Sequence, residues 1–442
     1  MGRALLTDLY ELRMAASLRR RGMDGEATFS VFVRALPPDR SFLVACGLDS
    51  CLDFLDGLTV DDDDLDALTT LGLDDVTVDA LAGLRFTGDV WAVPEGRVVL
   101  AGEPLLEVTA PIAEGQLVET YLLNQLTFAT NVASKAARTR VAAEGAALVD
   151  FAFRRTQGVE AAMTVARASA MVGYVATSNV EAARRYGLRV AGTMAHSYVG
   201  AFDLEDAAFR AFAEDNPGNA IFLVDTYDSR HGVQRAIDVI RELGLGATGG
   251  IRLDSGDLAA LAAEARTMLD DAALTDVQIF ASGGLDEYAI ADLVVAGAPI
   301  DAYGVGTNMG VSADAPSLES VYKLVEYDGR PVMKLSTGKA TTPGPKQVFR
   351  GRAGDVVALR DETPPSDCDA LLVPVMRDGH RVHRETLAEA RQRFESDLRL
   401  LPPEALRLRG SSPPTVTMSA RAEALRASVY KKLIGREEPP QV

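Results

Sequence analysis

The sequence predicts an α/β protein whose central part is a β/α barrel. Seven short apolar runs, each of strand length, fall within about 155 residues, and helical patterns separate them. Strands that alternate with helices in this way favour parallel pairing. Each run also ends on polar or glycine residues, as barrel strands do where several loops build one active site. No Gly-x-Gly-x-x-Gly follows the first run, so a barrel is favoured over an open dinucleotide-binding sheet.

The seven predicted strands are residues 148–153, 174–178, 190–196, 221–225, 250–254, 277–282 and 302–306. The helical patterns between them are clearest over residues 159–172, 232–243, 258–271 and 286–296. The carboxyl ends of parallel barrel strands lie on one face of the barrel. We therefore expect the residues that end these runs to converge on a single site, which predicts an enzyme.

Further elements are predicted on both sides of the barrel. Helices are expected over residues 1–20, beginning near Thr7 or Asp8, over the acidic segment 47–84 and over 112–145. Within the acidic segment, Asp61–Asp64 is interpreted as a helix N-terminus rather than a metal site. Short strands are expected at residues 27–33, 42–45, 88–93, 105–110, 348–350 and 356–359, and Arg-rich helices near 384–399 and 418–434.

These elements divide the chain into three parts. Residues 1–146 are predicted to form an N-terminal α+β domain, and residues 147–345 the barrel domain. Residues 346–442 form a C-terminal segment, which we expect to pack back on the N-terminal domain.

The composition excludes several classes of protein. The chain has 442 residues, a net charge of −18 and 47% hydrophobic residues. The negative charge argues against nonspecific nucleic-acid binding, which depends on cationic groups that neutralise phosphates. No run approaches the ~18–20 apolar residues that a membrane span needs, and the N-terminus lacks a signal-peptide pattern. Three cysteines without metal-ligand spacing predict a reduced, cytoplasmic protein.

Lysine is scarce and unevenly distributed. Of only seven lysines, five are Lys135, Lys323, Lys334, Lys339 and Lys346, and the last four of these fall within 24 residues. They are either a chance cluster on a surface loop or a loop of ammonium groups that faces phosphates. The sequence leaves both interpretations open.

The residues at the strand ends indicate the chemistry of the predicted site. They include Arg154, Arg155, Arg252, His196, Asp225, Asp228, Asp254 and Asp257. Arginine binds carboxylate or phosphate through two parallel hydrogen bonds. Backbone N–H groups in the glycine-rich segments 282–284 and 304–307 suit phosphate oxygens, and aspartates hold Mg²⁺ or ribose hydroxyls. Together they predict a site for a phosphorylated, Mg²⁺-bound sugar and a second, small anion.

His196 is the candidate for acid–base or nucleophilic chemistry. A lone histidine is more often structural than catalytic, but this one ends a strand beside Ser197 among other candidate site residues. An unperturbed pKa of ~6.5 lets histidine act as base, acid or nucleophile. His231, His380 and His383 have no comparable context and are interpreted as surface residues.

Several motifs, in order along the chain, resemble those of the nicotinate phosphoribosyltransferase family. They are Thr7–Leu12, Asp150–Arg155, Thr177–Val180, Gly192–Ser197, Asp225–Asp228, Arg252–Asp257 and Lys346–Val348, and the similarity runs from about residue 4 to about residue 350. The resemblance implies an irregular β/α barrel of the type II phosphoribosyltransferase kind beside an α/β domain. It also implies a homodimer with active sites built across the subunit interface.

The reaction that the resemblance implies forms nicotinate mononucleotide and pyrophosphate from nicotinate and phosphoribosyl pyrophosphate, a step of NAD salvage. ATP is the co-substrate, and its hydrolysis is coupled to transfer through a phosphohistidine. Mg²⁺ is expected to enter with the substrate pyrophosphate, and no protein ligand for the metal is assigned. Such a transfer needs no nucleophilic side chain at the ribose, because an oxocarbenium-like transition state requires positioning and charge stabilisation.

The resemblance also implies roles for individual residues. His196 corresponds to the phosphorylated histidine, and Asp254 is expected to act beside it where the phosphoribosyl group is bound. Nicotinate-binding positions are Tyr10 (from the neighbouring subunit), Phe151, Ser178, Thr193 and Arg252, and phosphoribosyl-binding positions are Arg154, Gly283, Gly306 and Thr307. The chain departs from the family at Ala152, where glycine is usual, and at Tyr198, where phenylalanine is common.

Other activities fit the sequence less well. A nicotinamide phosphoribosyltransferase carries an aspartate where this chain has Ser178, and a carboxylate there would repel nicotinate. A quinolinate phosphoribosyltransferase lacks the His196 motif, and open-sheet phosphoribosyltransferases carry adjacent acids, whereas Asp225 and Asp228 are three apart. A phosphate-binding barrel aldolase or isomerase would need a lysine at a strand end, and none of the seven ends has one. A non-catalytic binding protein would not need His196 beside phosphate-binding groups.

Overall fold

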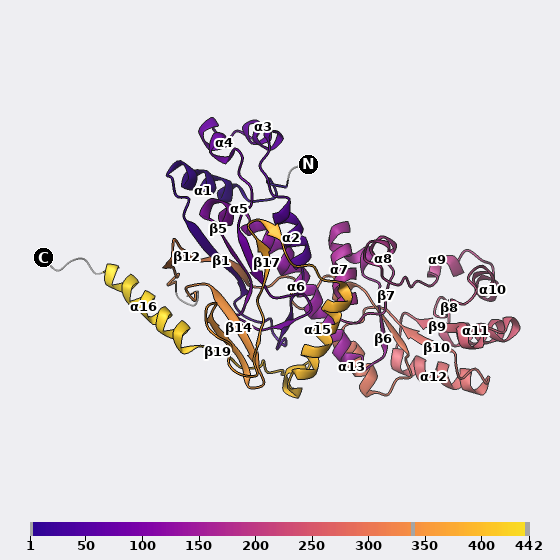
Figure 1. The fold of residues 1–442 in the computed structure, drawn as a ribbon. Coiled ribbons are helices and arrows are strands. Elements are labelled where there is room, and N and C mark those ends of the chain that lie inside the picture. The colour runs from indigo at the N-terminus through magenta and orange to yellow at the C-terminus, as the bar shows by residue number, and fades with distance from the viewer. Residues whose placement is uncertain (1–2, 337–340, 438–442) are drawn as a thin grey trace. The chain divides into compact units, whose positions relative to one another are not determined.

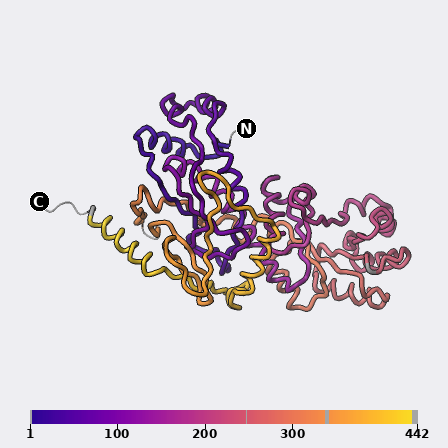
Figure 2. The backbone as a smooth tube through the Cα atoms, in the orientation of Figure 1, coloured from indigo at the N-terminus to yellow at the C-terminus, as the bar shows by residue number. Residues whose placement is uncertain are grey.

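The computed structural model describes residues 3–336 and 341–437, and these residues form two compact units. The central unit spans Val132–Pro316. The terminal unit combines the described residues up to Asn131 with those from Ser317 onward. In the backbone trace of Figure 2, the indigo and yellow parts of the chain therefore belong to one unit and the magenta-to-salmon part to the other.

A parallel sheet of six strands organises the central unit (Figure 1). The strands are β6 (Ala147–Asp150), β7 (Ala176–Thr177), β8 (Ala220–Leu223), β9 (Gly249–Leu253), β10 (Gln278–Ala281) and β11 (Ala302–Val305). They pair in the order β7-β6-β11-β10-β9-β8, and every pair is parallel. This is the strand order around a barrel that is open at one seam. The predicted irregular β/α barrel is therefore confirmed, in the form of a half-barrel sheet.

Helices alternate with these strands as the sequence predicted. They are α7 (Val159–Met171), α8 (Val180–Tyr186), α9 (His196–Val199), α10 (Glu205–Asp215), α11 (Ser229–Leu243), α12 (Leu258–Asp271), α13 (Glu287–Val295) and α14 (Thr307–Gly310). In α11, the side chains of Val233, Ala236, Ile237 and Ile240 recur at helical spacing and are buried. They join Phe222 of β8 in the apolar core of this unit.

The predicted strand over residues 190–196 is wrong. Among the described residues, one isolated bridge between Thr177 and Val190 continues the sheet there, and His196 already begins α9. The adjacent strand β7 has only two residues, and Val190 is 62% exposed, so a longer strand would bury little apolar surface. The seam of the half barrel lies here, where Asn219 Nδ2 donates to the carbonyl of Gly192 at 3.4 Å.

A seven-stranded sheet, in the order β13-β12-β1-β5-β3-β17-β18, forms the centre of the terminal unit, and its strand pairs are antiparallel. A four-stranded sheet (β16-β14-β15-β19) and a two-stranded one (β2-β4) complete it. The strands are β1 (Glu26–Val33), β2 (Leu43–Val44), β3 (Asp89–Ala92), β4 (Val98–Val99), β5 (Pro104–Pro111), β12 (Ser320–Tyr327), β13 (Arg330–Pro331), β14 (Lys346–Gly351), β15 (Gly354–Leu359), β16 (Asp369–Ala370), β17 (Val373–Arg377), β18 (His380–Arg381) and β19 (Val416–Met418). Because β12 and β17 flank strands from the first third of the chain, both ends of the sequence share one sheet.

The helices of the terminal unit are α1 (Leu9–Arg20), α2 (Leu48–Asp56), α3 (Asp62–Thr70), α4 (Asp75–Leu81), α5 (Ile112–Leu117), α15 (Leu387–Leu400) and α16 (Ala420–Glu437). Helix α6 (Glu119–Ala142) begins in this unit, and its residues from Val132 onward belong to the central unit. Asp61 caps α3 and exchanges two hydrogen bonds with Asp64, which confirms the acidic run as a helix N-terminus.

The helices and the cysteines bear on what the composition predicts. No helix in the described part of the chain is long and apolar enough to cross a membrane. Cys46, Cys51 and Cys368 are free thiols, and the first two are buried.

Candidate functional site

A cavity of about 520 Å³ opens at the carboxyl ends of several strands of the central unit. Its lining comes from the segments that follow β6, β7 and β9 and from the chain between Gly192 and His196. The lining residues are Phe151, Phe153, Arg154, Ser178, Gly192, Thr193, Met194, Ala195, His196, Arg252 and Asp254. Seven of these are residues that the sequence predicted for the site, so the structure brings those seven together.

Phe151 is held at the end of β6 by both backbone and side-chain contacts. Its N–H donates to the carbonyl of Val305 at 2.9 Å. The neighbouring strand β11 carries Gly304, where a Cβ would lie 2.6 Å from the Phe151 ring. Only glycine at position 304 therefore leaves room for the Phe151 ring beside this strand.

The loops after β6 and β7 are tied together by Asp150. Its buried carboxylate accepts from the backbone N–H of Ala152 at 2.8 Å and from the Thr177 hydroxyl at 2.7 Å. The Ser178 N–H in turn donates to the Asp150 carbonyl at 2.8 Å. Burial raises the pKa of the Asp150 carboxyl, and the two hydrogen bonds partly oppose this shift. Asp150 thus fixes the position of Ser178 without lining the cavity.

His196 begins α9 at the edge of the cavity, and its side chain is 47% exposed. Its Nδ1 lies 3.1 Å from the hydroxyl of Thr226, and its Nε2 lies 4.0 Å from Asp254 Oδ2. The two ring nitrogens therefore have different surroundings. Thr226 belongs to a motif that the sequence singled out, but its contact with His196 was not predicted.

Arg252 is the partly buried cation of the cavity. Its guanidinium donates to the Thr193 hydroxyl and lies 3.9 Å from Asp254 Oδ1. Its Nε is buried and has no hydrogen-bond partner among the described residues. Burial lowers the pKa of Arg252, whereas the nearby carboxylates of Asp254 and Asp225 raise it. A small carboxylate in the cavity would supply a further acceptor for this guanidinium.

Two aspartates form the acidic side of the site. Asp254 accepts a hydrogen bond from the Ser282 hydroxyl. Asp225 Oδ2 accepts from the Asp254 N–H at 2.9 Å and from the Ser255 hydroxyl at 2.7 Å. The other oxygen, Asp225 Oδ1, is buried without a hydrogen-bond partner in the described chain. Asp225 therefore supports the segment that carries Asp254.

The remaining predicted phosphate-binding positions lie beside this cavity. Gly283 adopts a φ of +92°, and a Cβ there would overlap the backbone oxygen of Asp254. Gly306 precedes α14, and a Cβ on it would lie 3.3 Å from the carbonyl oxygen of Phe151. Thr307 is exposed at the first position of α14. All three thus flank residues that line the cavity.

Other predicted candidates have structural roles. Asp228 accepts from the N–H of His231 at 2.8 Å and caps α11, and Asp257 caps α12 through the N–H of Ala260 at 3.1 Å.

Tyr10 lies on α1 in the terminal unit, where it is 48% exposed. Its contact with the pyridine ring stays a prediction. Across residues 3–336 and 341–437, no group of three or more His, Cys, Asp or Glu side chains could hold a metal ion.

The lysines fall into two groups. Lys346 Nζ is buried 2.9 Å from Glu107, and Lys323 Nζ lies 3.7 Å from Glu119. Lys135 Nζ is buried between Glu287 and Asp314. These three ammonium groups thus have carboxylate partners. Lys334 is exposed, and Lys339 lies outside the described residues.

Comparison with known proteins gives consistent matches along the chain. The N-terminal domain profile of nicotinate phosphoribosyltransferase (NAPRTase) matches residues 5–127, the profile of the NAPRTase family matches residues 146–350, and that of the C-terminal domain matches residues 320–426. The chain is 48% identical to a nicotinate phosphoribosyltransferase of Mycobacterium tuberculosis, over 91% of this chain and 88% of that protein. Its identity to the Bacillus subtilis nicotinate phosphoribosyltransferase is 42%, over 81% of this chain and 76% of that protein.

Solved structures show the same similarity. The crystal structure of human nicotinic acid phosphoribosyltransferase superposes with a TM-score of 0.84 at 30% identity, covering 96% of this chain and 99% of that one. A nicotinate-nucleotide pyrophosphorylase from Pyrococcus furiosus superposes with a TM-score of 0.75 at 25% identity, covering 90% and 95% of the two chains.

Proposed function

Because this chain belongs to the nicotinate phosphoribosyltransferase family, we propose that the cavity at the ends of β6, β7 and β9 is its active site. The protein is an enzyme that forms nicotinate mononucleotide and pyrophosphate from nicotinate and phosphoribosyl pyrophosphate, with ATP as co-substrate. One observation carries the assignment: Arg252, His196 and Asp254 line a single cavity together with Phe151.

Nicotinate binds with its carboxylate toward Arg252. The guanidinium of Arg252 and the hydroxyls of Thr193 and Ser178 supply the donors for that carboxylate. The pyridine ring lies against Phe151, and Tyr10 of the neighbouring subunit covers its other face. Ring stacking of this kind contributes roughly 0.5–1.5 kcal/mol beyond the buried area.

The phosphoribosyl group binds at the neighbouring loops. Arg154 and the backbone N–H groups at Gly283, Gly306 and Thr307 hold its phosphate oxygens. Asp254 faces the ribose, where its carboxylate accepts from hydroxyls and stabilises positive charge as the bond to pyrophosphate breaks. The pyridine nitrogen then attacks C1 of the ribose, and pyrophosphate leaves with the bonding electron pair.

Magnesium fits this arrangement as part of the substrate. The available donors are aspartate oxygens, including the partnerless buried Oδ1 of Asp225, and oxygen is the ligand that Mg²⁺ prefers. Asp225 and Asp254 would face a metal carried by the pyrophosphate. When bound there, Mg²⁺ neutralises the charge of the leaving group.

His196 couples ATP hydrolysis to the transfer. Its Nδ1 lies within hydrogen-bond distance of the Thr226 hydroxyl, and we assign the tautomer in which Nδ1–H donates to that hydroxyl and the Nε2 lone pair is available. Nε2 attacks the terminal phosphorus of ATP, the P–O bond to ADP breaks, and ADP leaves with its electron pair. Water later hydrolyses the phosphohistidine and releases phosphate. Asp254, close to Nε2, stabilises the imidazolium that the phosphorylation creates.

The finer cellular description is also proposed. The enzyme is a cytoplasmic homodimer with shared active sites, which agrees with its free thiols and with the half-exposed Tyr10 on the terminal unit. The barrel unit over Val132–Pro316 carries the chemistry, and the terminal unit supplies Tyr10 to the site of the neighbouring subunit.

Steady-state kinetics of two variants test the site. Arg252→Leu removes the carboxylate donor, so the KM for nicotinate should rise at least tenfold while the KM for phosphoribosyl pyrophosphate changes little. Gly283→Ala forces the loop away from Asp254, so it should raise the KM for phosphoribosyl pyrophosphate instead. Arg266→Leu is the matched control, because Arg266 is a partly buried arginine of the same unit that binds backbone carbonyls outside the cavity. An unchanged nicotinate KM in Arg252→Leu would overturn the assignment.

A further inference from the structure

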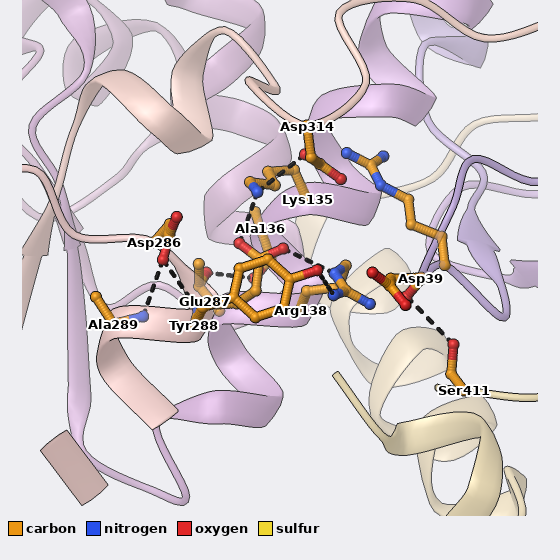
Figure 3. A network of polar contacts seen from close by, with 12 residues as sticks. Asp39, Lys135, Ala136, Arg138, Asp286, Glu287, Tyr288, Ala289, Asp314 and Ser411 are labelled. Carbon is orange, nitrogen blue, oxygen red and sulfur yellow. Dashed lines mark hydrogen bonds and ion pairs between the residues drawn. The ribbon is translucent and has the colours of Figure 1, made fainter. Parts of the chain in front are cut away.

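Two of the loops proposed to bind the phosphoribosyl group share one buried support, shown in Figure 3. The loop after β10, which contains Gly283, leads directly into α13. The loop after β11, which contains Gly306 and Thr307, leads through α14 to Asp314. Side chains from the last part of α6 bind both segments.

The start of α13 is fixed by two cations. Glu287, its first residue, has a fully buried side chain. Its Oε2 lies 2.6 Å from Lys135 Nζ, and its Oε1 accepts from Arg138 Nε at 2.9 Å. Arg138 also donates to the hydroxyl of Tyr288 at 3.1 Å. Helix α13 therefore cannot move without breaking a buried ion pair.

The same ammonium group fixes the second loop. Lys135 Nζ lies 2.9 Å from Asp314 Oδ1. The N–H of Ala313, next to Asp314, donates to the carbonyl of Asn308 at 3.0 Å. Asn308 Nδ2 in turn donates to the carbonyl of Gly284 at 2.8 Å. These contacts connect Lys135 through Asp314 to the second loop, from there to Gly284 in the first loop, and through Glu287 back to Lys135.

The energetics favour a positioning role over a purely stabilising one. The side chains of Lys135 and Glu287 are only 2% and 0% exposed, so both charges are desolvated. Desolvation offsets much of the attraction in a buried ion pair. Apolar residues of similar volume in the same place often stabilise a fold at least as much as the ion pair does. In this fold, the ion pairs of Lys135 join α6 to the start of α13 and to the segment at Asp314.

We infer that Lys135 is a positioning residue for phosphoribosyl pyrophosphate, setting the spacing between the loops at Gly283 and Gly306 without touching the substrate. The inference rests on the proposed function, which assigns these loops to the phosphoribosyl group. It also gives this lysine a role other than direct contact with phosphate.

The test compares Lys135→Met with Lys135→Arg in the full-length enzyme. Lys135→Met should raise the KM for phosphoribosyl pyrophosphate by about tenfold or more, because small displacements of binding groups have large effects. The kcat at saturation and the KM for nicotinate should stay within about twofold of wild type. Lys135→Arg keeps the charge and should recover most of the lost affinity. Isothermal titration with phosphoribosyl pyrophosphate alone should show the same order of affinities.

Glu205→Gln is the control for the loss of an ion pair made by a buried carboxylate, here with a half-exposed arginine as its partner. Glu205 is also the first residue of a helix, α10, its side chain is 0% exposed, and it lies 2.7 Å from Arg235 Nη1. This variant should lower the midpoint of thermal unfolding without changing the KM for phosphoribosyl pyrophosphate. Should Lys135→Met fail to fold, Glu287→Gln removes the opposite charge at constant volume and undergoes the same measurements.

The possible results separate the inference from the proposed function. An unchanged KM for phosphoribosyl pyrophosphate in a folded Lys135→Met enzyme overturns the inference, as does an equal rise in the KM of both substrates. If Gly283→Ala raises that KM and Lys135→Met does not, only the inference fails. If neither variant changes it, the assignment of the phosphoribosyl group to these loops fails as well.

Discussion

His196 shows how single contacts select among the possible roles of one residue. The sequence alone allowed a base, an acid or a nucleophile at this position. Thr226 lies beside Nδ1 and Asp254 near Nε2, and under the proposed function Nε2 carries the phosphoryl group. Asp254 also lies near Arg252, so the proposed coupling residue His196 and the proposed nicotinate-binding residue Arg252 share one neighbouring carboxylate.

Replacing His196 should separate ATP hydrolysis from transfer. His196→Ala is expected to abolish ATPase activity and self-phosphorylation while slow, uncoupled formation of nicotinate mononucleotide continues, because the ring stores a phosphoryl group and does not attack the ribose. Labelling with γ-³²P-ATP, read as acid-labile and base-stable phosphoprotein, measures the first effect. His231→Ala, at an exposed histidine on α11, is the control and should incorporate phosphate normally. Undiminished incorporation in His196→Ala would contradict the assigned role.

Helix caps fix where the loops that follow the strands of the central unit end and the next helices begin. Asn179, Asp228, Asp257 and Asp286 each accept a backbone N–H at the start of the helix that follows a strand end. Capping of this kind contributes about 1 kcal/mol per helix and fixes where each loop ends. The acidic residues after the strands therefore serve two purposes, since some cap helices and others face the cavity.

The terminal unit contains a carboxyl group whose protonation should affect stability. Glu103, just before β5, accepts from the N–H of Leu100 at 2.8 Å, and its Oε1 has no hydrogen-bond partner among the described residues. Burial, and then the neighbouring Asp355 of β15, raises the pKa of Glu103 well above its ordinary value. The folded protein therefore releases this proton at a higher pH than the unfolded chain does. The stability that this proton contributes is complete below the unfolded pKa of about 4.3 and is lost as the pH rises through the folded pKa.

Glu103→Gln should therefore flatten the pH dependence of stability. A glutamine amide can donate to Asp355 at any pH, so the free energy of unfolding of the variant should fall less than that of wild type between pH 5 and pH 8. Urea unfolding of both proteins at the two pH values measures this difference. The same slope against pH in both proteins would show that Glu103 is already ionised in the fold.

At the scale of the whole molecule, the predicted site residues are divided between the central and the terminal unit. The half-barrel sheet and its cavity lie within residues 132–316, whereas Tyr10 belongs to the unit formed by both ends of the chain. The first and last thirds of the sequence must therefore fold together, since β12 pairs with β1 and β17 with β3. A shared site in a homodimer would link the chemistry of one unit to the terminal unit of the neighbouring subunit.

Mixed dimers test whether Tyr10 acts across the interface. Tyr10→Ala and Arg252→Ala chains should each have low activity alone when nicotinate is kept well below their raised KM. In a heterodimer with shared sites, one site carries both lesions and the other carries neither, so mixing should restore up to half the wild-type activity per heterodimer. Differently tagged chains and size-exclusion chromatography verify that subunits exchange. Exchange without recovered activity would mean that each subunit supplies its own Tyr10.

The sequence by itself determined the elements and the chemical character of the strand ends. A periodic pattern of apolar residues predicts strands such as β10 and helices such as α11, and this pattern is a local property of the sequence. The motifs around Asp150, His196 and Arg252 are local in the same sense, which is why they already indicated the family. The prediction was wrong over residues 190–196, because exposure of that segment depends on a neighbouring strand of only two residues.

Only the tertiary structure decided which of these residues meet. His196 and Thr226 are 30 residues apart, and Arg138 and Glu287 are 149 apart, so neither contact leaves a local pattern. Lys135 illustrates the difference, since its sequence context allowed a phosphate-facing ammonium, whereas the fold buries it between two carboxylates. Buried charges need partners, and the partners available to a side chain are set by how distant segments pack.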